Sequence, residues 1–152
     1  MNNRIYKTTK ELTPFIKEML ENNKSVQLTV TGNSMFPLFK HLRDTVTVKK
    51  TDDYKKYDII LYLRKNGELV LHRVVKVKDE VFYLCGDNQI LIEYPIYKDQ
   101  IMGKVTSFVR KGKSIKADSF ISKFYAVFWC FLLKVRKPVI KALLKIWGFI
   151  KR

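Results

Sequence analysis

Short runs of alternating apolar and polar residues fill the sequence between residues 26 and 109, and this pattern constrains the fold most strongly. Successive side chains of a β-strand point to opposite faces of a sheet, so such alternation is typical of half-buried strands. The runs are VQLTV, TVTV, DIILYL, ELVLHRVVKV, VFYLCG and IMGKVTSFV. Asn66-Gly67 separates two of them and predicts a β-hairpin. We therefore expect a mainly β domain over residues 26–110.

Apolar residues recur at helical spacing on both sides of this β region. Residues 8–23 repeat them every three or four positions, which predicts an amphipathic helix within an N-terminal segment of residues 1–25. Residues 111–152 form a tail of another kind, in which large apolar residues alternate with lysines. A chain of 152 residues is long enough for one domain with a core and such an appendage.

The tail is strongly basic as well as apolar. Residues 110–152 hold 12 Lys and Arg against one acidic residue, Asp118. The longest apolar stretch, residues 124–133, is about half of the ~20 residues that span a bilayer. We expect a basic amphipathic helix at an anionic membrane surface. The residues predicted to contact lipid are Trp129, Lys141, Lys145 and Trp147.

Two other roles of the tail remain open. Its apolar face is also suited to packing on the β domain or on a second copy of the chain. Its charge is suited to nucleic acid, but nucleic-acid tails usually carry fewer large aliphatic residues, and no nucleic-acid-binding motif is present. We therefore expect a membrane partner and no nucleic acid.

The N-terminal residues and the cysteines bear on location and cofactors. Charges occur throughout the first 20 residues, so we expect neither a secretion signal nor an N-terminal anchor and place the chain at the cytoplasmic face of a membrane. Cys85 and Cys130 form no C-x-x-C pair. Neither a disulfide framework nor a zinc site is indicated, and no cofactor is predicted.

A polar loop between the first two predicted strands contains Ser34. Its neighbours Gly32, Asn33 and Pro37 are ordinary turn residues, so Ser34 is either a turn residue or a nucleophile that needs a base. His41 lies in a polar segment and is expected to face solvent.

His72 is the second candidate base for Ser34. It lies within the apolar run LVLHRVV, where a neutral imidazole could accept a proton near pH 7. The alternative is a core histidine that is bonded to a backbone group.

Two acidic residues follow the fifth predicted strand. Asp87 belongs to the turn sequence CGDNQ, where its carboxylate could simply accept hydrogen bonds from the loop backbone. Glu93 is the next acid in the chain. Either could orient His72 and stabilise its imidazolium, as the acid of a catalytic triad does.

Taken together, these segments resemble the signal peptidase I family, whose fold is shared by the SOS repressor and its self-cleaving relatives. GNSMFP resembles the nucleophile motif of the family, and DTVTV resembles the strand that follows it. KYDIILYL resembles its Gly-Asp-Ile-Val segment, with Tyr57 in place of the glycine. LHRVV and CGDNQ resemble the base motif and the Gly-Asp-Asn block, and the order and spacing agree over residues 27–109.

The resemblance implies roles for the site residues. Histidine followed by Arg-Val is the pattern of the archaeal and endoplasmic-reticulum branch, which implies that Ser34 pairs with His72. The self-cleaving relatives use lysine instead. The position of the triad acid in this branch is Glu93, and Asp87 matches an aspartate that the family also needs.

One departure concerns the oxyanion hole. Gly32 stands where the family commonly has a serine whose hydroxyl helps to bind the oxyanion. The remaining donors are the backbone N–H of Ser34 and Thr31 or Asn33, in a loop that also contains Met35 and Pro37. Loss of one such donor costs about 10²–10³ in rate in other enzymes.

The sequence therefore predicts a serine endopeptidase that cleaves signal or leader segments of precursor peptides or proteins. Its substrate is expected to bind as an extended strand. The alternative is a non-catalytic member of the same fold that binds peptides or membranes.

Overall fold

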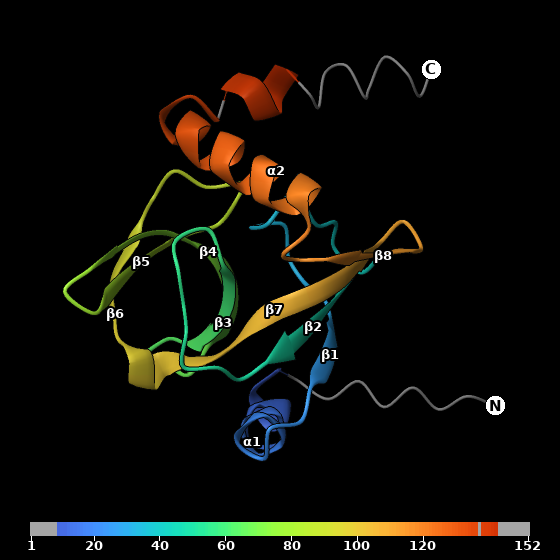
Figure 1. Ribbon diagram of the computed structural model, residues 1–152, viewed down its shortest axis with the longest axis vertical. Coiled ribbons are helices and arrows are strands. Elements are labelled where there is room, and N and C mark those ends of the chain that lie inside the picture. Colours follow the sequence, from blue (N-terminus) through green and yellow to red (C-terminus); the bar gives the residue numbers. More distant parts are fainter. Residues whose placement is uncertain (1–8, 137, 143–152) are drawn as a thin grey trace.

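The computed structural model describes residues 9–136 and 138–142, which form an antiparallel β-sheet with a helix near each end (Figure 1). The helices are α1 (Thr9–Glu21) and α2 (Phe120–Phe131), with 3-10 turns η1 (Lys98–Gln100) and η2 (Leu132–Lys134). The strands are β1 (Val26–Thr29), β2 (Thr45–Lys49), β3 (Ile59–Leu63), β4 (Leu69–Lys78), β5 (Val81–Cys85), β6 (Glu93–Ile96), β7 (Ile101–Arg110) and β8 (Lys113–Lys116). The prediction of a mainly β fold with an N-terminal and a C-terminal helix is confirmed.

The strands follow the order β1-β2-β7-β3-β4-β5-β6, and β8 also pairs with β7. The long strand β7 therefore contacts three others, β2, β3 and β8. Strands β3 and β4 form the hairpin predicted at Asn66-Gly67, closed by a 2.9 Å hydrogen bond from the Arg64 N–H to the Glu68 carbonyl. In this hairpin His72 lies opposite Ile60, at the centre of the sheet.

Two apolar clusters form the core, and alternate residues of β4 contribute to each. Leu69 and Leu71 pack against the first cluster, which α1 covers with Ile16 and Leu20. Val70 and Val74 belong to the second cluster, as the period of two in the sequence predicts. Because His72 is two residues from each of these valines, its side chain projects from the same face of β4.

Strands β6 and β8 were not predicted. The sequence of β6, EYPI, includes a proline, which is depleted in strands, and β6 lies at the edge of the sheet. The sequence of β8, KSIK, has no clear alternation, and it lies inside the segment predicted as a tail. Both short strands form because longer neighbours, β5 and β7, offer free backbone groups for pairing.

The placement of α2 corrects one prediction about the tail. Trp129 was expected to contact lipid, but its side chain is only 4% exposed and its Nε1–H donates a 2.9 Å hydrogen bond to the Asp87 carbonyl. The helix therefore packs on the β domain through this residue. Lys141 is exposed, whereas Lys145 and Trp147 lie outside the described residues. Within the described ranges, each helix is too short or too polar to cross a membrane.

Tyr57 adopts a backbone conformation that is unusual for a bulky residue. Its φ is +82°, in the left-handed region that favours glycine. Two hydrogen bonds hold it there: its N–H donates to the Val74 carbonyl at 2.8 Å, and its carbonyl accepts from Arg73 Nη1 at 3.1 Å. The glycine that the resemblance implies at this position therefore fits the observed backbone better than tyrosine does.

We predict that Tyr57→Gly is more stable than Tyr57→Ala by about 1 kcal/mol, since both remove the ring and only glycine accepts a positive φ without strain. Chemical denaturation measures the two free energies of unfolding. The control pair is Tyr94→Gly and Tyr94→Ala in the exposed part of β6, where alanine should be the more stable. Equal stability of the two Tyr57 variants would contradict the assignment of strain.

Candidate active site

The loop that carries Ser34 is closed at its base by the backbone. The Val30 N–H donates to the Asp44 carbonyl at 2.9 Å, and the Leu42 N–H donates to the Val30 carbonyl at 2.8 Å. The buried Asp44 carboxylate also accepts a 2.8 Å hydrogen bond from the Lys40 N–H. Met35, next to Ser34, is buried in the first core cluster. These contacts hold the loop against the core and leave Ser34 half-buried.

The Gly-Asp-Asn block contacts the same loop directly. The Asn88 N–H donates a 2.7 Å hydrogen bond to the Ser34 carbonyl. A Cβ atom at Gly86 would lie 2.6 Å from this carbonyl oxygen, so only glycine permits the close approach. The Gly-Asp-Asn block therefore fixes the position of the Ser34 backbone.

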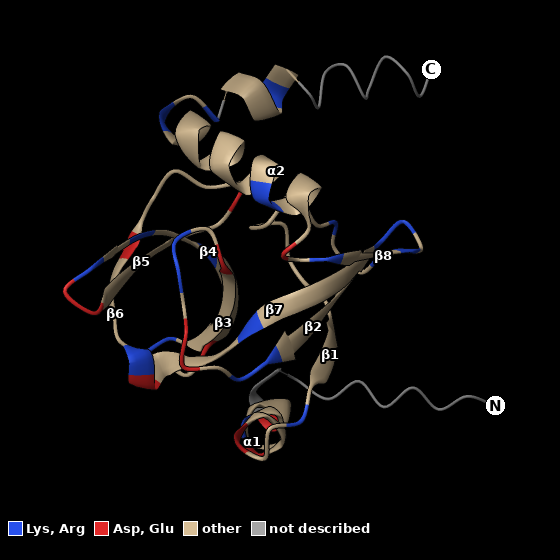
Figure 2. Cartoon of the chain, viewed as in Figure 1, with Lys and Arg blue, Asp and Glu red and all other residues tan. Residues whose placement is uncertain are grey.

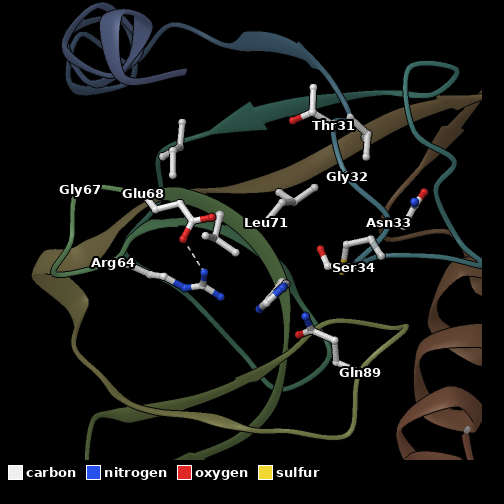
Figure 3. Close-up of a pocket in the computed structure, with 14 residues that line it drawn as sticks. Thr31, Gly32, Asn33, Ser34, Arg64, Gly67, Glu68, Leu71 and Gln89 are labelled. Carbon is white, nitrogen blue, oxygen red and sulfur yellow. Dashed lines mark hydrogen bonds and ion pairs between the residues drawn. The ribbon is translucent and has the colours of Figure 1, made fainter. Parts of the chain in front are cut away.

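Ser34 and His72 line the same pocket, of about 540 Å³. Figure 3 shows Ser34 and Gln89 on one side of this pocket and Arg64 and Glu68 on the other. In the described part of the chain, no direct hydrogen bond joins the Ser34 hydroxyl to the imidazole. Catalytic hydrogen bonds are often incomplete before substrate binds, so the shared pocket is the informative feature.

His72 is buried, with 1% of its surface exposed, and its Nδ1 faces Glu93. Nδ1 lies 3.2 Å from Glu93 Oε1 and 3.3 Å from the Tyr62 hydroxyl. Tyr62 in turn donates a 2.7 Å hydrogen bond to Glu93 Oε2, and Arg64 Nε donates to the same oxygen at 2.8 Å. Because the Tyr62 hydroxyl gives its proton to Glu93 and an ionised carboxylate only accepts hydrogen bonds, both neighbours favour the tautomer that carries its proton on Nδ1 and leaves the lone pair on Nε2.

The protonation states of this group follow from its surroundings. Burial lowers the pKa of His72 to about 4, although the Glu93 charge opposes the shift. Burial on its own would raise the pKa of Glu93, but hydrogen bonds from Arg64 and Tyr62 outweigh it and the pKa is lowered. At neutral pH a neutral imidazole therefore lies beside an ionised carboxylate, the states that a base and its orienting acid require.

Asp87 has a different partner. Its two carboxylate oxygens accept hydrogen bonds from Arg73 Nε at 2.9 Å and Arg73 Nη2 at 2.8 Å, and both side chains are buried. The Tyr125 hydroxyl of α2 donates to the same carboxylate at 3.3 Å. Of the two acids that the sequence left open, Glu93 lies beside His72 and Asp87 ties β4 to α2.

The loop offers backbone donors at its tip. The N–H groups of Asn33, Ser34 and Met35 make no hydrogen bond within the described ranges, so they are free to bind an oxyanion. Gly32 has a φ of +81°, which a serine side chain would strain. Its N–H donates a 2.8 Å hydrogen bond to Nδ1 of His41, an exposed residue as expected.

Pro37 is the last of the loop residues that the sequence predicted at the site. Pro37 lies in the loop and its carbonyl accepts a 3.3 Å hydrogen bond from Arg110.

Tyr62 and Arg64 were not predicted as site residues. The hydroxyl of Tyr62 within the apolar run IILYL was the only feature that could have indicated a site residue there, and no sequence pattern indicated Arg64. Among the residues that the structure describes, no three His, Cys, Asp or Glu side chains are grouped to hold a metal ion.

We predict that His72 makes the protein less stable in mild acid. The unfolded chain binds a proton at His72 near pH 6.5, whereas the folded protein binds it near pH 4. The contribution of His72 to the free energy of unfolding is therefore fully present above pH 6.5. It is lost as the pH falls, by about 2 kcal/mol between pH 7.5 and pH 5. Urea unfolding at the two pH values measures this loss. His72→Gln should lose about 2 kcal/mol less over the same interval, and equal losses would contradict the shifted pKa.

Comparison with known proteins adds the family. No curated protein matches the chain. A family model described as Peptidase S24-like matches residues 2–106, which include α1, the Ser34 loop, His72 and Glu93. This family covers serine peptidases related to the SOS repressor and to signal peptidases. The chain therefore belongs to the Peptidase S24-like family and has the fold of a serine peptidase.

Proposed function

We propose that this protein is a serine endopeptidase of the signal peptidase type, with Ser34 as nucleophile and His72 as base. The proposal rests on the protonation of His72 and on the groups that surround it. Burial favours the neutral form of His72, its Nδ1 lies 3.2 Å from Glu93 Oε1, and the residue lines the pocket that Ser34 also lines. A core histidine with a purely structural role needs neither the carboxylate nor the pocket.

The reaction follows from these positions. His72 Nε2 removes the Ser34 proton while Oγ attacks the scissile carbonyl carbon, and free N–H groups at the loop tip stabilise the oxyanion. The imidazolium gives its proton to the leaving amine, which departs and leaves an acyl-enzyme. Water, deprotonated by the same imidazole, then attacks the ester carbonyl. As the bond to Ser34 Oγ breaks, the imidazolium returns its proton to Oγ and the acid is released. In both steps Glu93 stabilises the positive charge on His72.

The pocket is suited to an extended peptide. The ladder between β4 and β5 begins at Arg73, so within the described structure residues 69–72 of β4 have an unpaired edge. A substrate strand can pair with this edge next to His72. Val30, Leu69 and Leu71 give the pocket an apolar lining, which favours small apolar side chains near the cut.

The histidine supports cleavage of signal or leader segments over self-cleavage. The self-cleaving relatives that share the fold use a lysine base, and this chain has His72 at the matching position. The residues that follow it, Arg73 and Val74, also match the histidine branch of the signal peptidases. We propose that the substrates are one or a few precursor peptides.

A second candidate is a non-catalytic peptide-binding protein of the same fold. Two observations favour it: Ser34 and His72 share no direct hydrogen bond in the described structure, and Gly32 offers no side-chain donor to an oxyanion. In that case the β4 edge and the apolar lining bind a peptide that is not cut.

We predict that new protein N-termini in cells depend on both Ser34 and His72. Profiles of N-termini are compared between cells that express the wild type, Ser34→Ala, His72→Ala or Ser114→Ala, the last an exposed serine on β8. Ser34→Ala should abolish a set of cuts, His72→Ala should reduce them by at least ~10³, and Ser114→Ala should leave them unchanged. Identical profiles from folded, equally abundant proteins would favour the peptide-binding alternative.

We predict that the two acids separate catalysis from stability. Glu93→Gln should lower kcat by about 10²–10⁴ with little change in KM, since an amide does not hold the imidazole tautomer or its charge. Asp87→Asn should instead lower the free energy of unfolding by about 3–5 kcal/mol, because it leaves Arg73 buried without its ion pair.

Kinetics on a peptide from the cleavage profile and urea unfolding of both variants measure the two effects. A larger stability loss in Glu93→Gln than in Asp87→Asn would contradict the assignment.

A further inference from the structure

Helix α2 lies beside the sheet (Figure 1), and it and the turn after it carry a run of large apolar side chains that are exposed to solvent. These exposed residues are Phe120, Ile121, Phe124, Val127, Phe128, Phe131 and Val135, which we call the outer face of α2. Phe124 is 65% exposed and Phe128 is 50% exposed, and their rings stack with centroids 6.3 Å apart. A contiguous apolar surface of this kind marks a binding surface in a folded protein.

The inner face of α2 holds the helix in this orientation. Trp129 bonds to the Asp87 carbonyl, and the Tyr125 hydroxyl bonds to the Asp87 carboxylate. Arg136 is fully buried beneath the helix, where Nε donates to the Trp129 carbonyl at 3.0 Å and Nη1 donates to the Gly86 carbonyl at 3.1 Å. Because these contacts prevent rotation of the helix, the outer face cannot turn inward to the core.

Basic residues flank the outer face: Lys123 lies beside Phe124 on α2, Lys134 in η2 lies beside Val135, and both lysines are exposed. Figure 2 shows basic positions on α2 and in the segment after it. Lys123 also lines a cleft of about 660 Å³ between α2 and the sheet, together with Lys55, Lys56, Lys104 and Lys116. Asp58 and Asp118 are the acidic residues of this cleft, and Asp58 is paired with Lys104. The cleft between α2 and the sheet is therefore predominantly positive, and Lys123 belongs both to this cleft and to the border of the outer face.

We propose that the outer face of α2 docks on the surface of an anionic lipid bilayer. Phenylalanine and isoleucine side chains enter the boundary between headgroups and acyl chains, and lysines at the border contact lipid phosphates. Charge argues against a second copy as the partner, because two outer faces in contact would bring the lysines of both copies together. The proposal concerns binding and holds whether or not Ser34 is catalytic.

Flotation of the full chain with lipid vesicles tests the proposal. The vesicles contain either phosphatidylcholine alone or phosphatidylcholine with phosphatidylglycerol. The double variant Phe124→Ser/Phe128→Ser changes two exposed residues, so it should fold normally, which circular dichroism verifies. The matched control is Phe15→Ser, which changes a phenylalanine of similar exposure, 58%, on α1 at the other end of the molecule.

We expect the wild type and Phe15→Ser to bind the anionic vesicles, more strongly than the neutral ones and less strongly at high salt. The double variant should bind at least tenfold more weakly. Equal binding by the double variant would overturn the proposal, as would failure of the wild type to bind or equal binding to both vesicle types. A wild-type dimer in solution that the double variant dissociates would also overturn it, and would assign the outer face to self-association.

Discussion

The buried ion pair of Asp87 and Arg73 connects the parts of the molecule that the site requires. Arg73 directly follows His72 on β4, and the neighbours of Asp87 contact the Ser34 carbonyl. Asp87 also bonds to α2 through Tyr125 and Trp129. Burial of two charges is costly, and here it is compensated by two hydrogen bonds within the pair and a third from α2. The strand that carries His72, the loop that carries Ser34 and the C-terminal helix thus share one anchor.

The proposed chemistry depends on a neutral imidazole beside an ionised carboxylate, although burial favours the neutral form of both groups. Burial favours the neutral form of His72, and it would do the same for Glu93 if Arg64 and Tyr62 did not hold the carboxylate in its ionised form. A lysine in the same place would need a stronger shift to lose its proton, because its ordinary pKa lies near 10.4. An imidazole therefore needs a smaller pKa shift than a lysine to be neutral in this pocket, and the acid beside it holds its tautomer.

Helix α2 is apolar on two faces for two different reasons. The inner face contributes Ala126 and Trp129 to the buried surface and contacts the loop beside Ser34 through Asp87. The outer face is exposed at Phe120, Phe124 and Phe131, and lysines border it. This arrangement joins the proposed membrane surface to the proposed site by a single helix.

The sequence by itself determined the features that depend on local pattern. Alternation located six of the strands, the spacing of apolar residues located α1, and the order of motifs led to the wider group of repressor- and signal-peptidase-like serine peptidases and to Ser34 and His72, which line one pocket. The residues alone left Glu93 and Asp87 open and the resemblance favoured Glu93. Only the folded sheet shows that Glu93 is the acid that faces the imidazole, because both acids follow β5. Trp129 was placed wrongly from sequence, since its partner Asp87 lies 42 residues away and no local pattern distinguishes an inward from an outward aromatic residue. Strands β6 and β8 were missed for a different reason: each pairs with the strand that precedes it in the chain, but EYPI contains a proline and KSIK has no clear alternation, so their own side chains predict no strand.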